Sequence, residues 1–425
     1  MLAQTAVKIR DQMARFSGKL SQGLCKPAQR FVEEMIYGIQ AAQSVQLSTI
    51  GRSLGEEIPL LKTVKRLSED LFRRELRPVL QAALLREGAK QIQEDSLLVL
   101  DLSDLVKPYA EKMEHLAWVR DGSTGELGKG YWLCQVIGVE NRVEEEETAI
   151  TPLYGELYSQ AAPDFVSENH EILSAVEKVS AATEKRGIWI IDRGGDRGEL
   201  YAELAPPERG RRFIIRQVGN REVCWGRRKL STVEIARRCA LPYATTVVRE
   251  DHGQEKVDHL EFGLTAVRLP EHPEVPLWLV VVKGFGEELL MLLVNFPLRK
   301  NRRLLWWVIS AYLTRWRIEE TIRFVKQSYE LEDIRVLRYE RLRNLMVLVV
   351  AAMFFAAAVL GRKTKLKVLV SHALASAKRL YGIPDFCYYA VADGLRAIFS
   401  RHPRRSRSPL THHAQASPLL PLFDT

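Results

Sequence analysis

The sequence predicts an α/β protein in which a mixed sheet, with helices on both faces, lies between two helical regions. Three features of the 425-residue chain lead to this fold class. Apolar residues recur at three- and four-residue spacing in the first 90 residues and again after residue 302, as amphipathic helices require. Between residues 95 and 218, short apolar runs alternate with helical segments. From 219 to about 298, strand-length segments are separated by turn residues.

Residues 1–90 are expected to form a helical DNA-binding domain. The segment "SVQLSTIGRSLGEEIP" predicts a short helix and a Gly-containing turn, and "LLKTVKRLSEDLF" the second helix of a helix-turn-helix. Lys62 and Arg66 lie four residues apart and would share one face of that second helix. A plain helical bundle with a solvated basic face fits the same residues.

Residues 91–218 are expected to form the first part of the core. "SLLVLDLSDL", "GYWLCQVIGVE" (130–140) and "AITPLYGELYS" (149–159) have the composition of strands. A helix (168–185), a buried strand (187–195), a short helix and a fifth strand (211–218) follow. Three strands in an antiparallel meander, followed by β-α units, produce a mixed sheet with helices on both faces.

The rest of the chain divides by composition. We expect a β-rich insertion at 219–300, a core helix at 301–340, C-terminal helices at 341–400 and a basic, disordered tail at 401–425. The apolar run from Leu345 to Leu360 is shorter than the ~20 residues that span a bilayer. It therefore predicts a buried helix and no membrane partner, with a membrane segment as the alternative.

The charge and cysteine content narrow the classes of function. Sixty-two Lys and Arg against 53 Asp and Glu give a net charge of +9, which favours a polyanionic partner. The five cysteines are scattered and never spaced as C-x-x-C, which indicates a reducing cytoplasm and neither disulfides nor a zinc site. The absence of H-E-x-x-H and of G-x4-G-K-[ST] argues against a zinc enzyme and a nucleotide cofactor.

The segment "YLTRWRIEETIRFVK" (312–326) predicts a helix with an unusual polar track. At about 100° per residue, Tyr312, Arg315, Glu319 and Lys326 fall within an arc of roughly 60°. Apolar residues lie on both sides of that arc, whereas a surface helix normally has one broad polar face. The pattern indicates a groove floor that meets a charged ligand. An i,i+4 ion pair between Arg315 and Glu319 is the simpler alternative.

Two carboxylates that close apolar strands favour the ligand interpretation. Asp101 ends "LLVLD" and Asp192 ends "IWIID". Together with Glu319 they would form an acidic cluster of the kind that holds Mg²⁺, and two ions ~3.5–4 Å apart can serve phosphoryl transfer. We expect Asp101 to bridge the ions and Asp192 and Glu319 to hold one each. Nearby Asp104 and Asp196 are alternatives to these ligands.

With these residues the chain resembles DDE transposases of the insertion-sequence-four type. The family signature Y-x2-R-x3-E-x6-K fits Tyr312, Arg315, Glu319 and Lys326 without a spacing error. The resemblance implies a ribonuclease-H-like core and a β-rich insertion between Asp192 and Glu319. It also implies two Mg²⁺ ions, with Mn²⁺ as a substitute, and a reaction that cuts transposon ends by hydrolysis and joins them to target DNA by transesterification.

The resemblance further implies the partners and the DNA contacts. These are double-stranded DNA (terminal inverted repeats and target), a second protomer in a homodimeric synaptic complex, and a bacterial, nucleoid-associated location in the cytoplasm. Tyr312, Arg315 and Lys326 would contact phosphates. Arg193 would do the same, unless it forms a surface ion pair. Trp225, among basic residues, would stack on an extruded base, or would only pack in its sheet. A metal-dependent nuclease and a catalytically silent DNA-binding descendant are the alternative functions.

Overall fold

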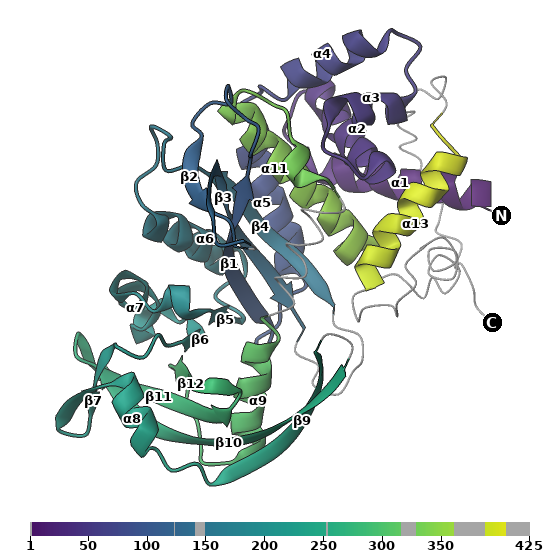
Figure 1. Ribbon diagram of the computed structural model, residues 1–425. Helices are drawn as coiled ribbons and strands as arrows, with labels where there is room; N and C mark the ends of the chain where they lie inside the picture. Colours follow the sequence, from purple (N-terminus) through teal and green to yellow (C-terminus); the bar gives the residue numbers. More distant parts are fainter. Residues whose placement is uncertain are drawn as a thin grey trace.

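The computed structural model describes residues 2–122, 124–140, 149–251, 254–315, 329–360 and 387–404. It consists of a large mixed sheet with helices on both faces, and a group of helices at one end (Figure 1). The expected α/β class with a mixed sheet is therefore present.

The first 89 residues are helical. The helices are α1 (Leu2–Leu20), α2 (Lys26–Ala42), α3 (Leu47–Leu54), α4 (Leu60–Asp70) and α5 (Leu76–Ala89). Gly55 ends α3 in the left-handed region, with φ 61°, where its missing Cβ avoids strain. The predicted helix, turn and helix thus correspond to α3, residues 55–59 and α4.

The central region follows the predicted order of elements, with one short strand added. The elements are β1 (Leu97–Val106), β2 (Ala117–Arg120), β3 (Leu127–Val139), β4 (Ile150–Tyr158), α6 (Glu168–Ala182), β5 (Ile188–Ile191), α7 (Gly198–Leu204) and β6 (Arg212–Arg216). Strand β3 pairs antiparallel with β1 and β4, and β1, β5 and β6 are mutually parallel neighbours. The short strand β2, which we did not predict, extends the line of β4 along the same edge of β3.

Residues 222–294 do not form a separate sheet, contrary to the simplest interpretation of an insertion. The elements are β7 (Glu222–Trp225), β8 (Arg228–Ser231), α8 (Thr232–Arg238), β9 (Tyr243–Asp251), β10 (Gln254–Leu269), β11 (His272–Gly284) and β12 (Gly286–Val294). Strand β12 pairs with β6, so the sheet continues in the order β2-β3-β1-β5-β6-β12-β11-β10-β7-β8. The exposed edge of β6 is thereby covered, which removes a site for aggregation.

Two hydrophobic clusters lie on the two faces of the sheet. One contains Val99 and Ile190 together with residues of α1, α2, α9 (Arg302–Leu313) and α11 (Tyr339–Phe354). The other contains Leu100 and Ile191 together with residues of α6, α7 and α8. Consecutive strand residues point to opposite faces, so continuous apolar runs such as "LLVL" serve both clusters.

Helix α11 connects the helical end of the molecule with the sheet. It packs on α2, α5 and β4, continues as a π-helical turn at Phe355–Leu360, and lies near α13 (Cys387–Arg401) in Figure 1. By length and composition, the helix from Tyr339 to Leu360 could cross a membrane, but 89% of its most apolar window is buried inside the structure. The helix is longer than the sixteen-residue apolar run in the sequence suggested. Its burial, and not its length, therefore identifies it as a core helix.

Candidate active site

Asp101 and Asp192 occupy equivalent positions on two neighbouring parallel strands. The register between β1 and β5 runs up to the pair Leu100–Ile191. The next residues are Asp101 and Asp192, and the backbone of Asp192 is still extended, with φ −74° and ψ −173°. Because neighbouring strands lie about 4.8 Å apart, the two half-buried aspartates stand side by side on one face of the sheet.

That face is the one on which the cluster with α9 lies. By strand alternation, Asp101 shares its face with Val99, and Asp192 shares its face with Ile190. Val99, Ile190 and Tyr312 of α9 belong to the same buried cluster. The aspartates and the chain segment leading toward Glu319 therefore lie on the same side of the sheet.

The position of Asp101 differs from the sequence prediction. We expected it to end its strand, but β1 continues five residues farther, to Val106. The carboxylate is instead at mid-strand, where β5 ends and β1 goes on with β3 as its partner. Asp192 does follow the last residue of β5, as predicted.

Two further polar residues extend the aspartate pair into a row across the sheet. Gln135 of β3 is the register partner of Asp101. Arg216 of β6 follows the pair Ile191–Ile215, so it is level with Asp192. Sequence reasoning missed both. The signal for Arg216 was available, since "RFIIR" also closes an apolar strand with a charge.

A tight turn after β5 orients the Asp192 carboxylate. Its Oδ1 accepts a hydrogen bond from the Gly194 amide at 2.7 Å, and its carbonyl oxygen accepts one from Gly195 at 2.9 Å. A Cβ at position 194 would lie 2.9 Å from Oδ1, so the glycine permits this approach. Arg193, within the turn, is exposed, and the predicted phosphate contact remains a prediction.

The predicted polar track is described only at its beginning. Tyr312 and Arg315 are 3% and 7% exposed, with the Arg315 guanidinium 5.9 Å from the Tyr312 ring centre. The Tyr312 hydroxyl is buried without a hydrogen-bond partner among the described residues. Helix α9 ends at Leu313, and the Arg315 amide donates to the Tyr312 carbonyl in a 3₁₀-like turn. Uniform 100° steps therefore do not hold at the start of the track. Positions 319 and 326, the predicted glutamate and lysine, lie outside the described residues.

The two alternative aspartates have other contacts. Asp104 lies three residues after Asp101, hence on the opposite face of β1, and accepts a hydrogen bond from the Gly122 amide at 3.1 Å. Asp196 is almost fully buried, pairs with Arg221, and accepts a hydrogen bond from the Val218 amide. Neither residue joins the row of Asp101 and Asp192.

In the predicted helix-turn-helix, one of the two predicted DNA contacts has a structural role. Arg66 donates to Glu34 and Glu56, each at 2.7 Å, and Glu34 is buried. Burial alone would lower the pKa of Arg66, but these carboxylates raise it. Its guanidinium is thus occupied by internal ion pairs, which argues against the predicted phosphate contact. Lys62 is exposed, and its contact with DNA remains a prediction.

Trp225 lies at the end of β7, where it is half-buried. Its indole N–H donates to the Thr265 hydroxyl at 2.9 Å, and its ring packs against the second cluster. These contacts match the packing alternative. Exposed Arg227, Arg228 and Lys229 follow directly, and base stacking on the ring remains a prediction.

The donor chemistry of the aspartate pair fits a divalent cation. Mg²⁺ is typically held by one or two carboxylates and substrate phosphates, with oxygen ligands throughout. Within the described ranges no three His, Cys, Asp or Glu side chains gather to hold a metal. The predicted third ligand lies in the segment 316–328, outside those ranges.

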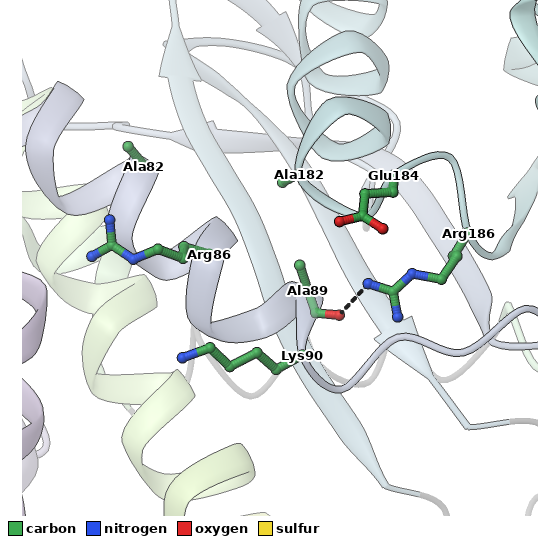
Figure 2. Close-up of a pocket in the computed structure, with 7 residues that line it drawn as sticks. All are labelled: Ala82, Arg86, Ala89, Lys90, Ala182, Glu184 and Arg186. Carbon is green, nitrogen blue, oxygen red and sulfur yellow. Dashed lines mark hydrogen bonds between the residues drawn. The ribbon is translucent and has the colours of Figure 1, made fainter.

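A cavity of about 340 Å³ lies at the other end of β5 (Figure 2). The residues that line it are Ala82, Arg86, Ala89, Lys90, Ala182, Glu184 and Arg186. Arg186 donates to the carbonyl oxygens of Ala89 and Ile92 and so caps the end of α5. The cavity precedes β5, whereas Asp192 follows it, so the two sites are separate.

Comparison with known proteins gives a distant structural likeness. No protein-family model matches the sequence, and no match is found among curated proteins. Among solved structures, the chain is similar to a piggyBac transposase in a synaptic complex with hairpin DNA, seen by cryo-electron microscopy. The TM-score is 0.44 with 10% identity, over 93% of this chain and 77% of that one.

Proposed function

We propose that this protein is a metal-dependent DNA transposase of the insertion-sequence-four type with a ribonuclease-H-like core. The observation that carries the proposal is the pair Asp101 and Asp192, level with each other on adjacent parallel strands. Two carboxylates so placed on neighbouring strands repel each other unless a cation or a shared proton lies between them. The order of the central strands, β4-β3-β1-β5-β6, supports the proposed core.

The residues divide the task between cation and DNA. Asp101, Asp192 and Glu319 would hold Mg²⁺ or Mn²⁺. When bound, such ions activate a nucleophile and neutralise charge at the phosphate in an in-line displacement. Asp192, held by the turn at Gly194, presents its carboxylate in a fixed direction. The chain thus supplies a preorganised acidic pair beside the phosphate.

Basic and hydroxyl groups on the same side of the sheet as the pair would hold the DNA backbone. Arg216 is level with Asp192 and offers a planar fork that suits a phosphate. The buried Tyr312 hydroxyl has no hydrogen-bond partner among the described residues, so it could donate to a phosphate oxygen. Arg315, and Lys326 by the signature, would add positive charge. We propose terminal inverted repeats and target DNA as substrates, two protomers in the synaptic complex, and a bacterial cytoplasmic location.

Cutting and joining assays on plasmid DNA test this function. The substrate is a supercoiled plasmid that carries the DNA flanking both sides of the reading frame, with Mg²⁺ or Mn²⁺. The wild type should give joined products with short target duplications. Nicks without joining would indicate a nuclease, and binding without cutting a silent descendant.

A matched set of variants ties the reaction to the aspartate pair. Asp101→Asn and Asp192→Asn should each lower cutting by about a hundred- to a thousandfold, as loss of a charge-stabilising group does. Asp104→Asn, on the opposite face of the same strand, should retain cutting. Mg²⁺ should raise the melting temperature of the wild type but not that of Asp192→Asn. Equal activity of Asp101→Asn and Asp104→Asn would refute the proposed site.

A further inference from the structure

A short hairpin at one end of the sheet presents exposed apolar and basic side chains together. In the pairing of β2 with β3, Trp118 lies opposite Lys129, and Arg120 lies opposite Leu127. Trp118 is 63% exposed and Leu127 70% exposed, while Arg120 and Lys129 are also exposed. We call these four residues the hairpin platform.

The exposure of Trp118 is unusual for its residue type. Tryptophan carries the largest apolar surface of any side chain and is mostly buried in soluble proteins. On the other side of β2, Ala117 and Val119 are buried, so the hairpin itself is firmly seated. The ring of Trp118 is therefore held on a rigid strand with most of its surface available to a ligand.

The basic residues of the platform indicate a negatively charged ligand. Arg120 and Lys129 are both exposed, so their charged groups are accessible to a ligand from solvent. The acidic neighbours Asp121 and Glu126 are in the connecting turn, where an Asp121 oxygen accepts a hydrogen bond from the Thr124 amide. Aromatic rings between basic side chains are typical of surfaces that bind unpaired nucleic-acid strands.

The platform continues the face that carries the proposed active site. Along β3, alternate residues from Lys129 to Gln135 share one face, and Gln135 is the partner of Asp101. Six residues of strand correspond to about 20 Å, or about six nucleotide steps of a B-form strand. On this face, Tyr131 and Leu133 between them are buried, and Tyr131 stacks on Tyr339 of α11. A DNA strand with its reacting phosphate at Asp101 would therefore reach Trp118 by passing over this covered stretch.

We propose that the hairpin platform binds an unpaired DNA strand next to the cutting site, with a base stacked on Trp118 and phosphates near Arg120 and Lys129. This inference rests on the proposed function, because that function supplies the DNA and places its reacting phosphate at Asp101. Bases inside a duplex are stacked on each other and cannot cover the ring, so the occupant has to be unpaired.

Equilibrium binding of short labelled DNAs tests the proposal without any cutting. The probes are a blunt duplex and the same duplex with a single-stranded overhang of about six nucleotides. Binding is followed by fluorescence anisotropy in EDTA, in the Asp101→Asn background, so it is independent of catalysis. Trp118→Ala should weaken binding of the overhang probe about tenfold and that of the blunt duplex by less than twofold. Trp118→Phe, which keeps an aromatic face, should recover most of the affinity.

Charge variants supply the second measurement and its control. The double change Arg120→Ala with Lys129→Ala should reduce the salt dependence of overhang binding by about 1.4 in the slope of log K against log salt. Lys185→Ala removes an exposed lysine at the opposite end of β5 and should leave the slope unchanged.

Three results would overturn the proposal. One is equal binding of the overhang probe by Trp118→Ala and the parent. Another is an equal loss for the blunt duplex, which indicates duplex docking. The third is unchanged DNA binding with lost self-association of Trp118→Ala in sedimentation, which would assign the platform to contact between copies of this chain. Loss of overhang binding without any cutting activity in the wild type would refute the proposed function alone.

Discussion

Glu156 of β4 is a buried carboxylate whose replacement should destabilise the protein strongly. It is 3% exposed and accepts hydrogen bonds from Arg77 at 2.8 Å, Gln81 at 3.1 Å and Arg343 at 2.9 Å. These partners belong to α5 and α11, so one side chain joins two helices to the sheet. Burial alone would lower the pKa of Arg343, but the neighbouring Glu156 carboxylate raises it.

The expected cost follows from the charges that Glu156→Gln leaves behind. Among the described residues, Glu156 is the only carboxylate that pairs with Arg77, whereas Arg343 also pairs with exposed Asp164 at 2.8 Å. Removing one member of a buried ion pair costs about 3–5 kcal/mol. The remaining ion pair of Arg343 with Asp164 and the amide oxygen of the new Gln side chain offset part of this cost. We therefore expect the free energy of unfolding to fall by about 2–4 kcal/mol.

Thermal unfolding and hydrogen exchange measure the effect. Glu156→Gln should lower the melting temperature by about 2–4 °C and speed amide exchange in α5 and α11. Glu69→Gln is the matched control, because its pair with Lys65 is 3.9 Å long and both side chains are largely exposed. That variant should change stability by less than about 0.5 kcal/mol. If Glu156→Gln melts and exchanges like Glu69→Gln, the ionic network does not hold the helices to the sheet.

Two further predictions concern a buried lysine and a buried glycine. Burial lowers the pKa of Lys107 to about 8. Below that pH the buried charge destabilises the folded protein. This cost declines as the pH rises from about 8 toward the pKa of lysine in the unfolded chain. Between pH 7 and 10 the wild type should therefore gain about 2 kcal/mol relative to Lys107→Met in urea unfolding, and parallel pH profiles would contradict this. At Gly263, a Cβ would lie 2.0 Å from the Ala240 carbonyl oxygen, so Gly263→Ala should cost at least about 2 kcal/mol. Gly18→Ala, in an exposed helical position with open space, should be neutral or stabilising by up to about 1 kcal/mol, and equal melting of the two variants would refute the backbone clash.

Local pattern was sufficient for the order of the elements in the central region. Apolar runs bounded by Gly or Pro became β3, β4, β5 and β6, and the amphipathic segment at 168–185 became α6. These assignments depend on side-chain periodicity, which the sequence carries directly. The four-residue strand β2 was not predicted, because so short a segment shows no clear periodicity.

Tertiary structure changed the interpretation of several charged residues. Arg66 had the spacing of a DNA contact, but the fold places Glu34 and Glu56 beside it. Asp104 looked like an alternative ligand, and strand alternation sends it to the face opposite Asp101. Such outcomes depend on residues far away in the chain, which local pattern does not reveal.

The sequence by itself determined that two apolar strands each carry an aspartate, at positions 101 and 192. Only the tertiary structure decided that these residues are level with each other, and that Gln135 and Arg216 stand in the same row. It also decided that β12 pairs with β6 and joins two predicted regions into one sheet. The physical reason is that side-chain alternation is a property of one strand's sequence, whereas register is set by hydrogen bonds between strands, here nearly a hundred residues apart in the chain.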